Sequence, residues 1–320
     1  MTAQIRPEAP VPAMSLLRRP PASLIALVAL GAVLSIAPRV SAEPAPPPPR
    51  MIGFMTDFDL KDDSVAICKA VMESVAPGVR VLDITHVVEP YDIAEAARYL
   101  AGAAPYFPKD AVFIVVVDPG VGSTRKAIIA RSGRGQYFVL PDNGLLTLVQ
   151  EQSGIVGARE ITNTAWMIGA KTSSTFHGRD IFSPTAAHLA RGDDWTDAGP
   201  ALDVTKLVRL DLHSASLTGA GIAAQVIGTD GPYGNLVLNL PAETFAKAGY
   251  VLGDTVGFEL DGKPYRAPFV RTFSDVPVGQ PLLYIDSRGR LSLGLNQRNF
   301  AEAFRIPTGA ALTIPRKPGS

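Results

Sequence analysis

Three short polar clusters carry the residues that could do chemistry in this sequence. They are Thr56-Asp57, residues 118–123 (DPGVGS) and residues 175–180 (TFHGRD). An aspartate at the end of a strand can hold the hydroxyls of a ribose, and a histidine can accept a proton near neutral pH. These residue types indicate a pocket for a small polar molecule and leave its chemistry open.

Aspartates crowd the first cluster, where Asp57, Asp59, Asp62 and Asp63 follow one another closely. A calcium loop starting at Asp57 needs glycine at its sixth position and glutamate at its twelfth, but the sequence has Asp62 and Cys68 there. N-capping of the following helix by Asp62 or Asp63 explains part of the cluster. We therefore expect no metal here.

The other two clusters match no common phosphate or zinc motif. The DPGVGS stretch lacks both the GK[ST] ending of a phosphate loop and the GxGxxG of a dinucleotide fold, so by itself it predicts a turn. His177 has no second histidine at ligand spacing, which argues against zinc. A lone histidine is most often structural, yet Thr175, Arg179 and Asp180 surround this one with polar groups. Its role stays open at this point.

The first half of the chain alternates between apolar runs and helical patterns. We expect strands at 51–56, 79–84 and 111–117, with helices at 62–76 and 92–106. Continuous apolar strands between amphipathic helices are typical of a mostly parallel sheet with helices on both faces. Ligands bind beyond the carboxyl ends of such strands, which is where we place the three polar clusters.

The pattern changes after about residue 204. Short β-rich runs, separated by Gly, Pro and Asp, occur at 221–228, 236–240, 256–260, 282–286 and 291–295. This spacing favours a small antiparallel barrel or sandwich. We expect an amino-terminal α/β domain over 51–205 and a smaller carboxy-terminal β domain over 206–315.

Composition excludes several classes of function. The 320 residues include 30 basic and 30 acidic side chains, so the net charge is zero and the chain lacks the positive surface needed for a nucleic-acid partner. Cys68 is the single cysteine, which excludes an internal disulfide and any multi-cysteine metal site. It shares a helical face with Val65, Met72 and Val75, so we expect it in the core.

The amino-terminal segment has the order of a Sec-type signal peptide. Arg18 and Arg19 precede an apolar run at 24–36, and small residues at 40–42 form a cleavage site. We expect a signal peptide over 1–42, a Pro-rich linker over 43–50, and a mature protein that is periplasmic or secreted. The apolar run is too short to span a bilayer as a helix, which argues against stable membrane insertion, although an uncleaved anchor remains the alternative.

Seven motifs in order give the sequence a family resemblance. They are TDFDLKDDSV at 56–65, DITHVVEPYDI at 83–93, VVVDPGVGS at 115–123, LPDNGLL at 140–146, TFHGRDIF at 175–182, DGPYGN at 230–235 and SRGRL at 287–291. Together they resemble the S-adenosyl-L-methionine (SAM) hydrolases, or SAM hydroxide adenosyltransferases, which are relatives of the SAM-dependent fluorinase and chlorinase. The resemblance runs from about Met51 to Ala311.

The resemblance implies hydrolysis of SAM to adenosine and L-methionine, with water attacking the ribose 5′ carbon and no cofactor required. The family's Asp–Arg–His set, which holds and activates that water, corresponds to Asp118, Arg125 and His177. Its ribose-binding aspartate corresponds to Asp57. His177 could accept the proton, whereas an arginine could not; the sequence does not decide which residue takes it.

The resemblance also implies the remaining binding residues and the assembly. The adenine and ribose pocket corresponds to Tyr91, Phe176, Phe273 and Asn235, and the amino-acid end of SAM to Asp62, Ser64, Asp230, Ser287 and Arg288. In the family this pocket lies between the amino-terminal domain of one subunit and the carboxy-terminal domain of the next. A homotrimer is therefore expected.

Two other functions are compatible with the same pocket. The first is halide transfer to SAM, but halide-using relatives shape a halide cup at the positions of Asp118 and Val121 and have serine where Gly178 lies. A carboxylate at 118 would repel an anion. The second is an exported nucleoside- or SAM-binding protein without turnover, and the intact Asp–Arg–His set argues against it.

The sequence departs from the family pattern at two places. Asp59 stands where the family usually has glycine, which adds a charge close to the ribose site. Leu238-Asn239 replaces the usual Thr-Asn. We expect the second change to affect only the packing of the β domain.

Overall fold

The computed structural model describes residues 49–169 and 171–319. The predicted signal peptide and residues 43–48 of the predicted linker lie outside the described residues. Within the described ranges, no helix is both long and apolar enough to cross a membrane. The described chain is organised by one sheet of seven strands and one of eight.

The first sheet has the strand order β2-β1-β3-β5-β4-β6-β7. Its strands are β1 (Ile52–Thr56), β2 (Val81–Thr85), β3 (Val112–Val116), β4 (Ala127–Ser132), β5 (Tyr137–Pro141), β6 (Ile155–Glu160) and β7 (Ala201–Leu202). Strands β2, β1, β3 and β5 are parallel neighbours, while β4, β6 and β7 extend the sheet by antiparallel pairing.

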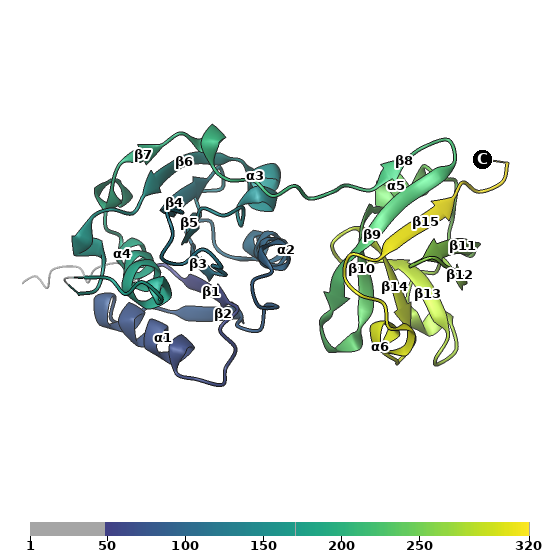
Figure 1. Cartoon of the computed structure of the whole chain (residues 1–320), viewed down its shortest axis with the longest axis horizontal. Coiled ribbons are helices and arrows are strands. Elements are labelled where there is room, and N and C mark those ends of the chain that lie inside the picture. The colour runs from purple at the N-terminus through teal and green to yellow at the C-terminus, as the bar shows by residue number, and fades with distance from the viewer. Residues whose placement is uncertain (1–48, 170, 320) are drawn as a thin grey trace, which may run out of the picture. The chain divides into compact units, whose positions relative to one another are not determined.

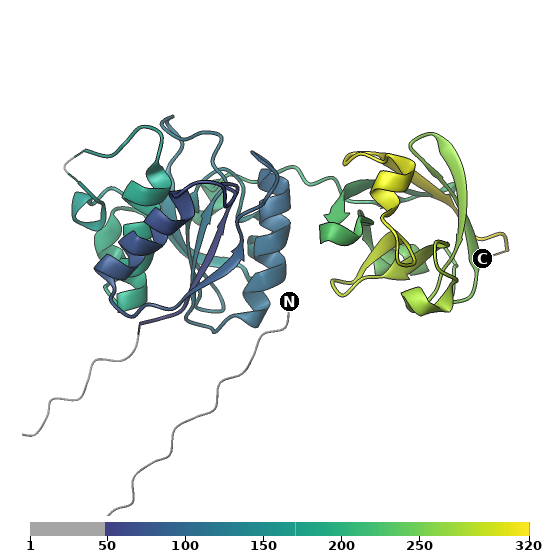
Figure 2. The same cartoon turned by 90° about the horizontal axis from the view of Figure 1, so that it is seen from below.

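Four helices cover this sheet: α1 (Ser64–Val75), α2 (Ile93–Ala103), α3 (Thr147–Ser153) and α4 (Ser183–Arg191). Helices α1 and α4 lie on one face, and α2 and α3 on the other (Figures 1 and 2). Strand β3 shows why, because Ile114 packs in the core beneath α1 and α4 while its neighbours Phe113 and Val115 pack beneath α2. The predicted two-sided α/β architecture is confirmed.

The sheet is more mixed than the sequence pattern indicates. The connection between β4 and β5 is only residues 133–136, and such a short link forces antiparallel pairing, since a parallel crossover takes a dozen residues or more. An apolar run in the sequence indicates that a strand is buried but not in which direction it runs. The antiparallel pairing of β4, β6 and β7 could therefore not be predicted from the apolar pattern.

Cys68 lies in the core, as predicted. Its side chain is fully buried on α1 in the cluster that contains Val65 and Met72. Burial raises the pKa of this thiol to about 11, so it stays protonated and unreactive at neutral pH.

The second sheet is antiparallel throughout, with the order β12-β11-β15-β9-β10-β14-β13 and β8 paired to β9. Its strands are β8 (Ser216–Leu217), β9 (Gly221–Asp230), β10 (Asn235–Pro241), β11 (Thr255–Leu260), β12 (Lys263–Pro268), β13 (Pro281–Ile285), β14 (Arg290–Leu295) and β15 (Ala311–Pro315), with helices α5 (Ala242–Ala246) and α6 (Phe300–Phe304). A bridge between Phe269 and Leu283 nearly closes the sheet into a barrel, which confirms the predicted β-domain class.

Candidate active site

A cavity of about 400 Å³ lies at the carboxyl ends of β1 and β3. Thr56 and Val116 are register partners in these neighbouring strands, so the aspartates that follow them meet at one edge of the sheet. Six predicted site residues line the cavity: Asp57, Ser64, Tyr91, Asp118, Phe176 and His177. The sequence prediction therefore assembles in space at the expected strand ends.

Arg125 connects Asp118 to His177. Its Nε donates to Asp118 Oδ1 at 2.9 Å, and one N–H of its Nη2 donates to Asp118 Oδ2. Nη2 also contacts His177 Nδ1 at 2.9 Å. The pair is almost buried, because the side chains of Arg125 and Asp118 are 11% and 4% exposed. The predicted Asp–Arg–His set forms one hydrogen-bonded unit, in which Asp118 and His177 line the cavity and Arg125 joins them without lining it.

This contact fixes the protonation of His177. A guanidinium has only donors, so Nδ1 of His177 must accept from Arg125, and a neutral ring then carries its proton on Nε2. Burial and the positive charge of Arg125 both lower the pKa of His177. The imidazole is consequently neutral near pH 7 and offers an N–H, not a free lone pair, at Nε2.

The loop carrying DPGVGS packs tightly against the segment before His177. Gly122 has φ +77°, and a Cβ at this position would come within 2.5 Å of the carbonyl oxygen of Ser174. Only glycine fits both this conformation and this approach. The stretch is thus more than a turn, since it joins the loop of Asp118 and Arg125 to the loop of His177.

A π-helical turn at Gly178–Phe182 leads from the site into α4. Within it, Asp180 Oδ2 accepts from the backbone N–H of Ser173 at 2.6 Å, which holds the preceding loop. The guanidinium of Arg179 lies 5.1 Å from the ring centre of Phe176. Phe182 packs beneath Arg125, with 5.2 Å between the guanidinium carbon and the ring centre. The dense polar surroundings of His177 therefore position the cavity residues.

Asp57 is held by the backbone of Tyr91, whose N–H donates to Asp57 Oδ2 at 3.0 Å. Among the described residues, Asp57 Oδ1 has no hydrogen-bond partner in the protein. Tyr91 itself has φ +70° and is 72% exposed. One carboxylate oxygen thus fixes the loop, while the other is available to a ligand.

Two further aspartates of the cluster, Asp62 and Asp59, make local contacts within residues 59–64. Asp62 does not line the cavity; its Oδ1 accepts from the N–H of Ser64, the first residue of α1, at 2.9 Å. Asp63 occupies the N-cap position but makes no side-chain capping hydrogen bond. Asp59 has φ +63°, a conformation that favours glycine, and its carboxylate pairs with Lys61 at 2.9 Å. The charge that Asp59 adds near the site is therefore balanced locally.

The β domain has a cavity of its own, of about 1070 Å³. Asp230, Asn235 and Phe273 from the predicted set line it. Gly294 makes room for two of them, because a Cβ there would lie 2.4 Å from Asn235 Oδ1 and 3.2 Å from the Phe273 ring. The structure thus gathers three of the five predicted carboxy-terminal residues in one place.

Ser287 and Arg288 do not line that cavity. They lie in the turn between β13 and β14, where Asp286 Oδ1 accepts from the N–H groups of Arg288 at 2.8 Å and Arg290 at 2.9 Å. The departure at Leu238-Asn239 concerns the barrel itself: Leu238 is fully buried in its core, and Asn239 bonds to backbone groups at 2.7 and 2.8 Å.

The sequence prediction missed Phe58. This ring lines the cavity and meets Phe176 edge to face, with ring centres 6.0 Å apart. Its position directly after Asp57, at a strand end, was the available signal. An aromatic residue there is equally compatible with simple core packing, so the sequence alone does not identify it.

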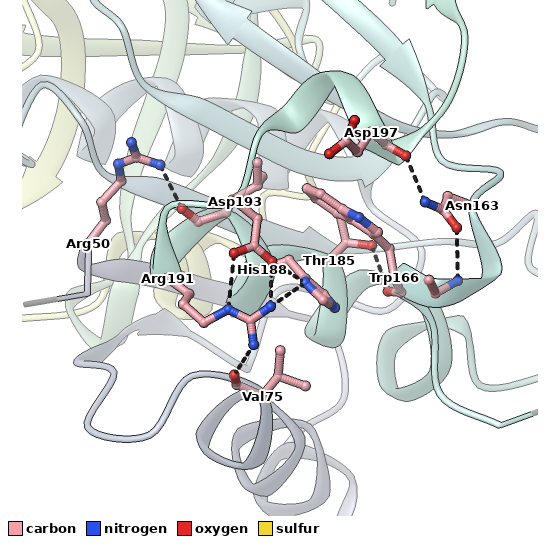
Figure 3. A network of polar contacts seen from close by, with 11 residues as sticks. Arg50, Val75, Asn163, Trp166, Thr185, His188, Arg191, Asp193 and Asp197 are labelled. Atoms are coloured by element: carbon pink, nitrogen blue, oxygen red, sulfur yellow. Dashed lines mark hydrogen bonds and ion pairs between the residues drawn. The ribbon is translucent and has the colours of Figure 1, made fainter. Parts of the chain in front are cut away.

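A second Asp–Arg–His cluster lies away from this cavity, at the end of α4 (Figure 3). His188 Nδ1 is 2.6 Å from Asp193 Oδ2, and Arg191 bonds to Asp193 and to the carbonyl oxygen of Val75. The His188 ring stacks on Trp166, with centres 4.8 Å apart. This cluster ties the ends of α4 and α1 together and does not line the cavity.

The chain is an α/β protein with a cavity at the carboxyl ends of its parallel strands, followed by a barrel-like β domain. The family model of the SAM hydroxide adenosyltransferase N-terminal domain matches residues 52–199, and that of the C-terminal domain matches residues 224–313. The chain belongs to the SAM hydroxide adenosyltransferase family.

Relatives in this family have two different names. An (R)-S-adenosyl-L-methionine hydrolase of Salinispora tropica is 40% identical, over 83% of this chain and 98% of the relative. A fluorinase of an Actinoplanes species is 33% identical, over 83% of this chain and 97% of the relative. The crystal structure of an uncharacterized conserved protein from Thermotoga maritima is 37% identical, with a TM-score of 0.79 over 83% of this chain and all of that one.

Proposed function

We propose that this protein hydrolyses SAM to adenosine and L-methionine. The observation that carries the proposal is the hydrogen-bonded set of Asp118, Arg125 and His177, of which Asp118 and His177 line a cavity that Asp57 also lines. Membership of a family whose relatives include SAM hydrolases supports the same reaction.

The reaction places modest demands on the site. Water forms a bond to the ribose C5′ while the C5′–S bond breaks, and the bonding pair leaves with sulfur, which turns the cationic sulfonium into the neutral thioether of methionine. No acid is needed to protonate this leaving group. The protein must hold a water in line with C5′ and accept the proton that it loses, and alignment alone is a large contribution.

The geometry supports distinct roles for the three residues. Asp118 lines the cavity, and its carboxylate keeps lone pairs beyond those engaged by Arg125, so it holds the water and takes its proton. Arg125 fixes both carboxylate oxygens and stabilises hydroxide character in the water. His177 lines the cavity, accepts from Arg125 through Nδ1 and carries its proton on Nε2. In this scheme His177 orients and donates, and it is not the base.

We assign the ribose hydroxyls to Asp57, whose Oδ1 has no protein partner among the described residues, with Tyr91 and Phe176 beside the nucleoside and Ser64 toward the amino-acid end. For Asp62, which bonds to the N–H of Ser64, the role of positioning that serine fits better than direct contact.

A homotrimer with shared sites completes the proposal. In this arrangement the barrel of a neighbouring copy brings its Asp230, Asn235, Phe273, Ser287 and Arg288 to the cavity of the α/β domain. Exposed apolar side chains favour such burial, since Tyr91 of the first cavity and Tyr233 and Val278 of the second are 72%, 69% and 59% exposed. Sedimentation analysis of the purified chain tests the assembly, and a monomer would contradict it.

The site of action is proposed from the sequence. The charged, apolar and small-residue order of the amino-terminal segment supports cleavage after Ala42 and export to the periplasm or medium. Amino-terminal sequencing of the protein recovered outside the cytoplasm would test this. A chain that retains residues 24–36 would favour a membrane anchor instead.

The reaction itself is tested by a product assay on the proposed mature protein, which begins at Glu43. It is incubated with SAM in halide-free buffer and then with added chloride or fluoride. Adenosine and methionine in equal amounts, independent of halide, are the expected products. A 5′-halo nucleoside would contradict the role of Asp118, and binding of adenosine without turnover would indicate a binding protein.

A further inference from the structure

One buried titratable residue near the cavity has no part in the proposed reaction. His86 is only 4% exposed, and it lies directly after β2 in the motif at 83–93, from which only Tyr91 was assigned to the site. Its ring packs edge-on against Phe54, with centres 4.6 Å apart. Such deep burial of an imidazole calls for hydrogen-bond partners.

The partners of His86 lead to the cavity. Its Nδ1 is 2.9 Å from Thr56 Oγ1, both atoms being buried, and the same oxygen accepts from the N–H of Phe58 at 3.2 Å. The backbone carbonyl of His86 accepts from the N–H of Asp59 at 2.7 Å. Both ends of the segment 56–59 are therefore attached to this one residue, with Asp57 and Phe58 between them.

The opposite side of the ring sets the direction of these bonds. His86 Nε2 lies 3.2 Å from Asp83 Oδ1 without the geometry of a hydrogen bond, and Asp83 pairs with Lys69 at 2.6 Å. The negative charge of Asp83 beside Nε2 favours the proton of the neutral ring on that nitrogen, so Nδ1 accepts the hydroxyl proton of Thr56. Thr56 then keeps its lone pairs for the N–H of Phe58.

We infer that His86 is a positioning residue for nucleoside binding: through Thr56 and its own carbonyl it fixes the 56–59 turn that presents Asp57 and Phe58 to the cavity. The segment that begins at His86 also ends at Tyr91, whose N–H holds Asp57 from the other side. The inference rests on the proposed function, because it assigns the nucleoside to this cavity.

A positioning role for His86 affects the binding of SAM and adenosine but not the rate of turnover. Contacts to the ribose are made before and during the reaction, so loosening them raises KM and the adenosine Kd while kcat changes little. Asp118, Arg125 and His177 are on other segments and keep their geometry. For His86→Ala in the full chain, we expect KM for SAM and Kd for adenosine to rise about tenfold, with kcat within about twofold.

Two further variants distinguish positioning from general destabilisation. His86→Asn restores an acceptor near Nδ1 and should recover most of the affinity. Thr56→Val removes the hydroxyl while preserving shape, so it should raise Kd like His86→Ala, and the double variant should be no worse than either single one. The matched control is His188→Ala, which removes another histidine paired with aspartate and stacked on an aromatic ring (Figure 3).

The results for these variants distinguish a positioning role of His86 from a merely structural one. A rise in KM and adenosine Kd for His86→Ala and Thr56→Val, with rescue by His86→Asn and none of it in His188→Ala, supports the inference. Unchanged KM for SAM and unchanged adenosine Kd in His86→Ala or in Thr56→Val, or a fall confined to kcat, overturns the inference. If the wild-type chain neither binds adenosine nor hydrolyses SAM, the proposed function fails instead.

Discussion

The molecule contains two clusters with the same three residue types. Asp118 and His177 line the cavity of the α/β domain and are joined by Arg125. Asp193, Arg191 and His188 form the other cluster, at the end of α4 (Figure 3). In both clusters the arginine grips the carboxylate and approaches histidine Nδ1 with Nη2, at 2.9 Å in the first and 3.1 Å in the second.

The clusters differ in what Nδ1 meets first. At the end of α4, Asp193 lies 2.6 Å from His188 Nδ1, so this nitrogen donates and the cluster is closed on itself. At the cavity, Nδ1 of His177 meets the guanidinium of Arg125, which has only donors, so this nitrogen accepts and the ring proton lies on Nε2. The same residue types therefore join two helix ends in one place and line a cavity in the other, and composition alone does not distinguish the two clusters.

Removing the arginine from each cluster should give the largest contrast. Arg125→Ala frees both oxygens of Asp118 and removes the charge that stabilises the attacking water, so we expect kcat/KM for SAM to fall about 10²–10³-fold. Arg191→Ala should leave kcat/KM within about twofold. Steady-state methionine release measures both, and equal losses in the two variants would show that the cavity cluster is structural.

The two histidines should separate almost as clearly. His177→Ala should reduce turnover about 10²-fold and leave adenosine Kd within about twofold, because the ribose is held elsewhere; His188→Ala should change neither. His177→Asn places an amide oxygen where Arg125 can donate to it, so we expect turnover to recover to within about tenfold of wild type. If His177 is instead the general base, asparagine will be as inactive as alanine.

The acidic limb of the pH profile of kcat/KM tests the protonation state assigned to His177. The pKa of His177 is lowered by burial and by Arg125, so the ring stays neutral below its ordinary value of about 6.5. Protonation would place an N–H against the guanidinium, so activity falls only at lower pH. We expect kcat/KM to change less than about twofold between pH 8 and 6.5, and the acidic limb to move to lower pH in His177→Asn, where only the base Asp118 still has to be ionised. An unchanged limb in that variant would assign it to another group.

Much of this site was predictable because the ends of buried strands can be identified in the sequence. Continuous apolar runs located β1 and β3, and Asp57 and Asp118 follow them directly, so their meeting at one sheet edge followed from parallel pairing alone. Arg125 was different: nothing in its spacing marks it, and only the family resemblance indicated its partnership with Asp118 and His177.

What the sequence could not give was the outcome of long-range pairing. His86 reaches Thr56 because β1 and β2 are neighbours, across 30 positions of sequence, and no local pattern reports that. The antiparallel direction of β4 is equally absent from the local sequence pattern, since a strand buried on both faces has the same apolar pattern in either direction. Asp62 illustrates a third limit, because a carboxylate beside a helix start can cap the helix or meet a ligand, and the sequence is identical in both cases.

The smallest expected effect concerns stability and belongs to the second cluster. Arg191 Nη1 donates to the carbonyl oxygen of Val75 at 3.0 Å, which joins the last turn of α4 to that of α1, yet its side chain is 47% exposed. Exposure limits its worth, so we expect Arg191→Ala to lower the free energy of unfolding by about 1 kcal/mol and the thermal midpoint by about 2–4 °C.

Arg191→Lys is the matched variant for this prediction. It retains the charge beside Asp193 but not the planar group that reaches Asp193 and Val75 together, so its midpoint should lie between those of wild type and Arg191→Ala. Thermal unfolding followed by circular dichroism, with kcat/KM measured on the same samples, provides the check. A loss of activity that tracks the loss of midpoint across the two variants would mean that the brace at α4 also shapes the cavity, because Gly178–Phe182 leads from His177 directly into this helix.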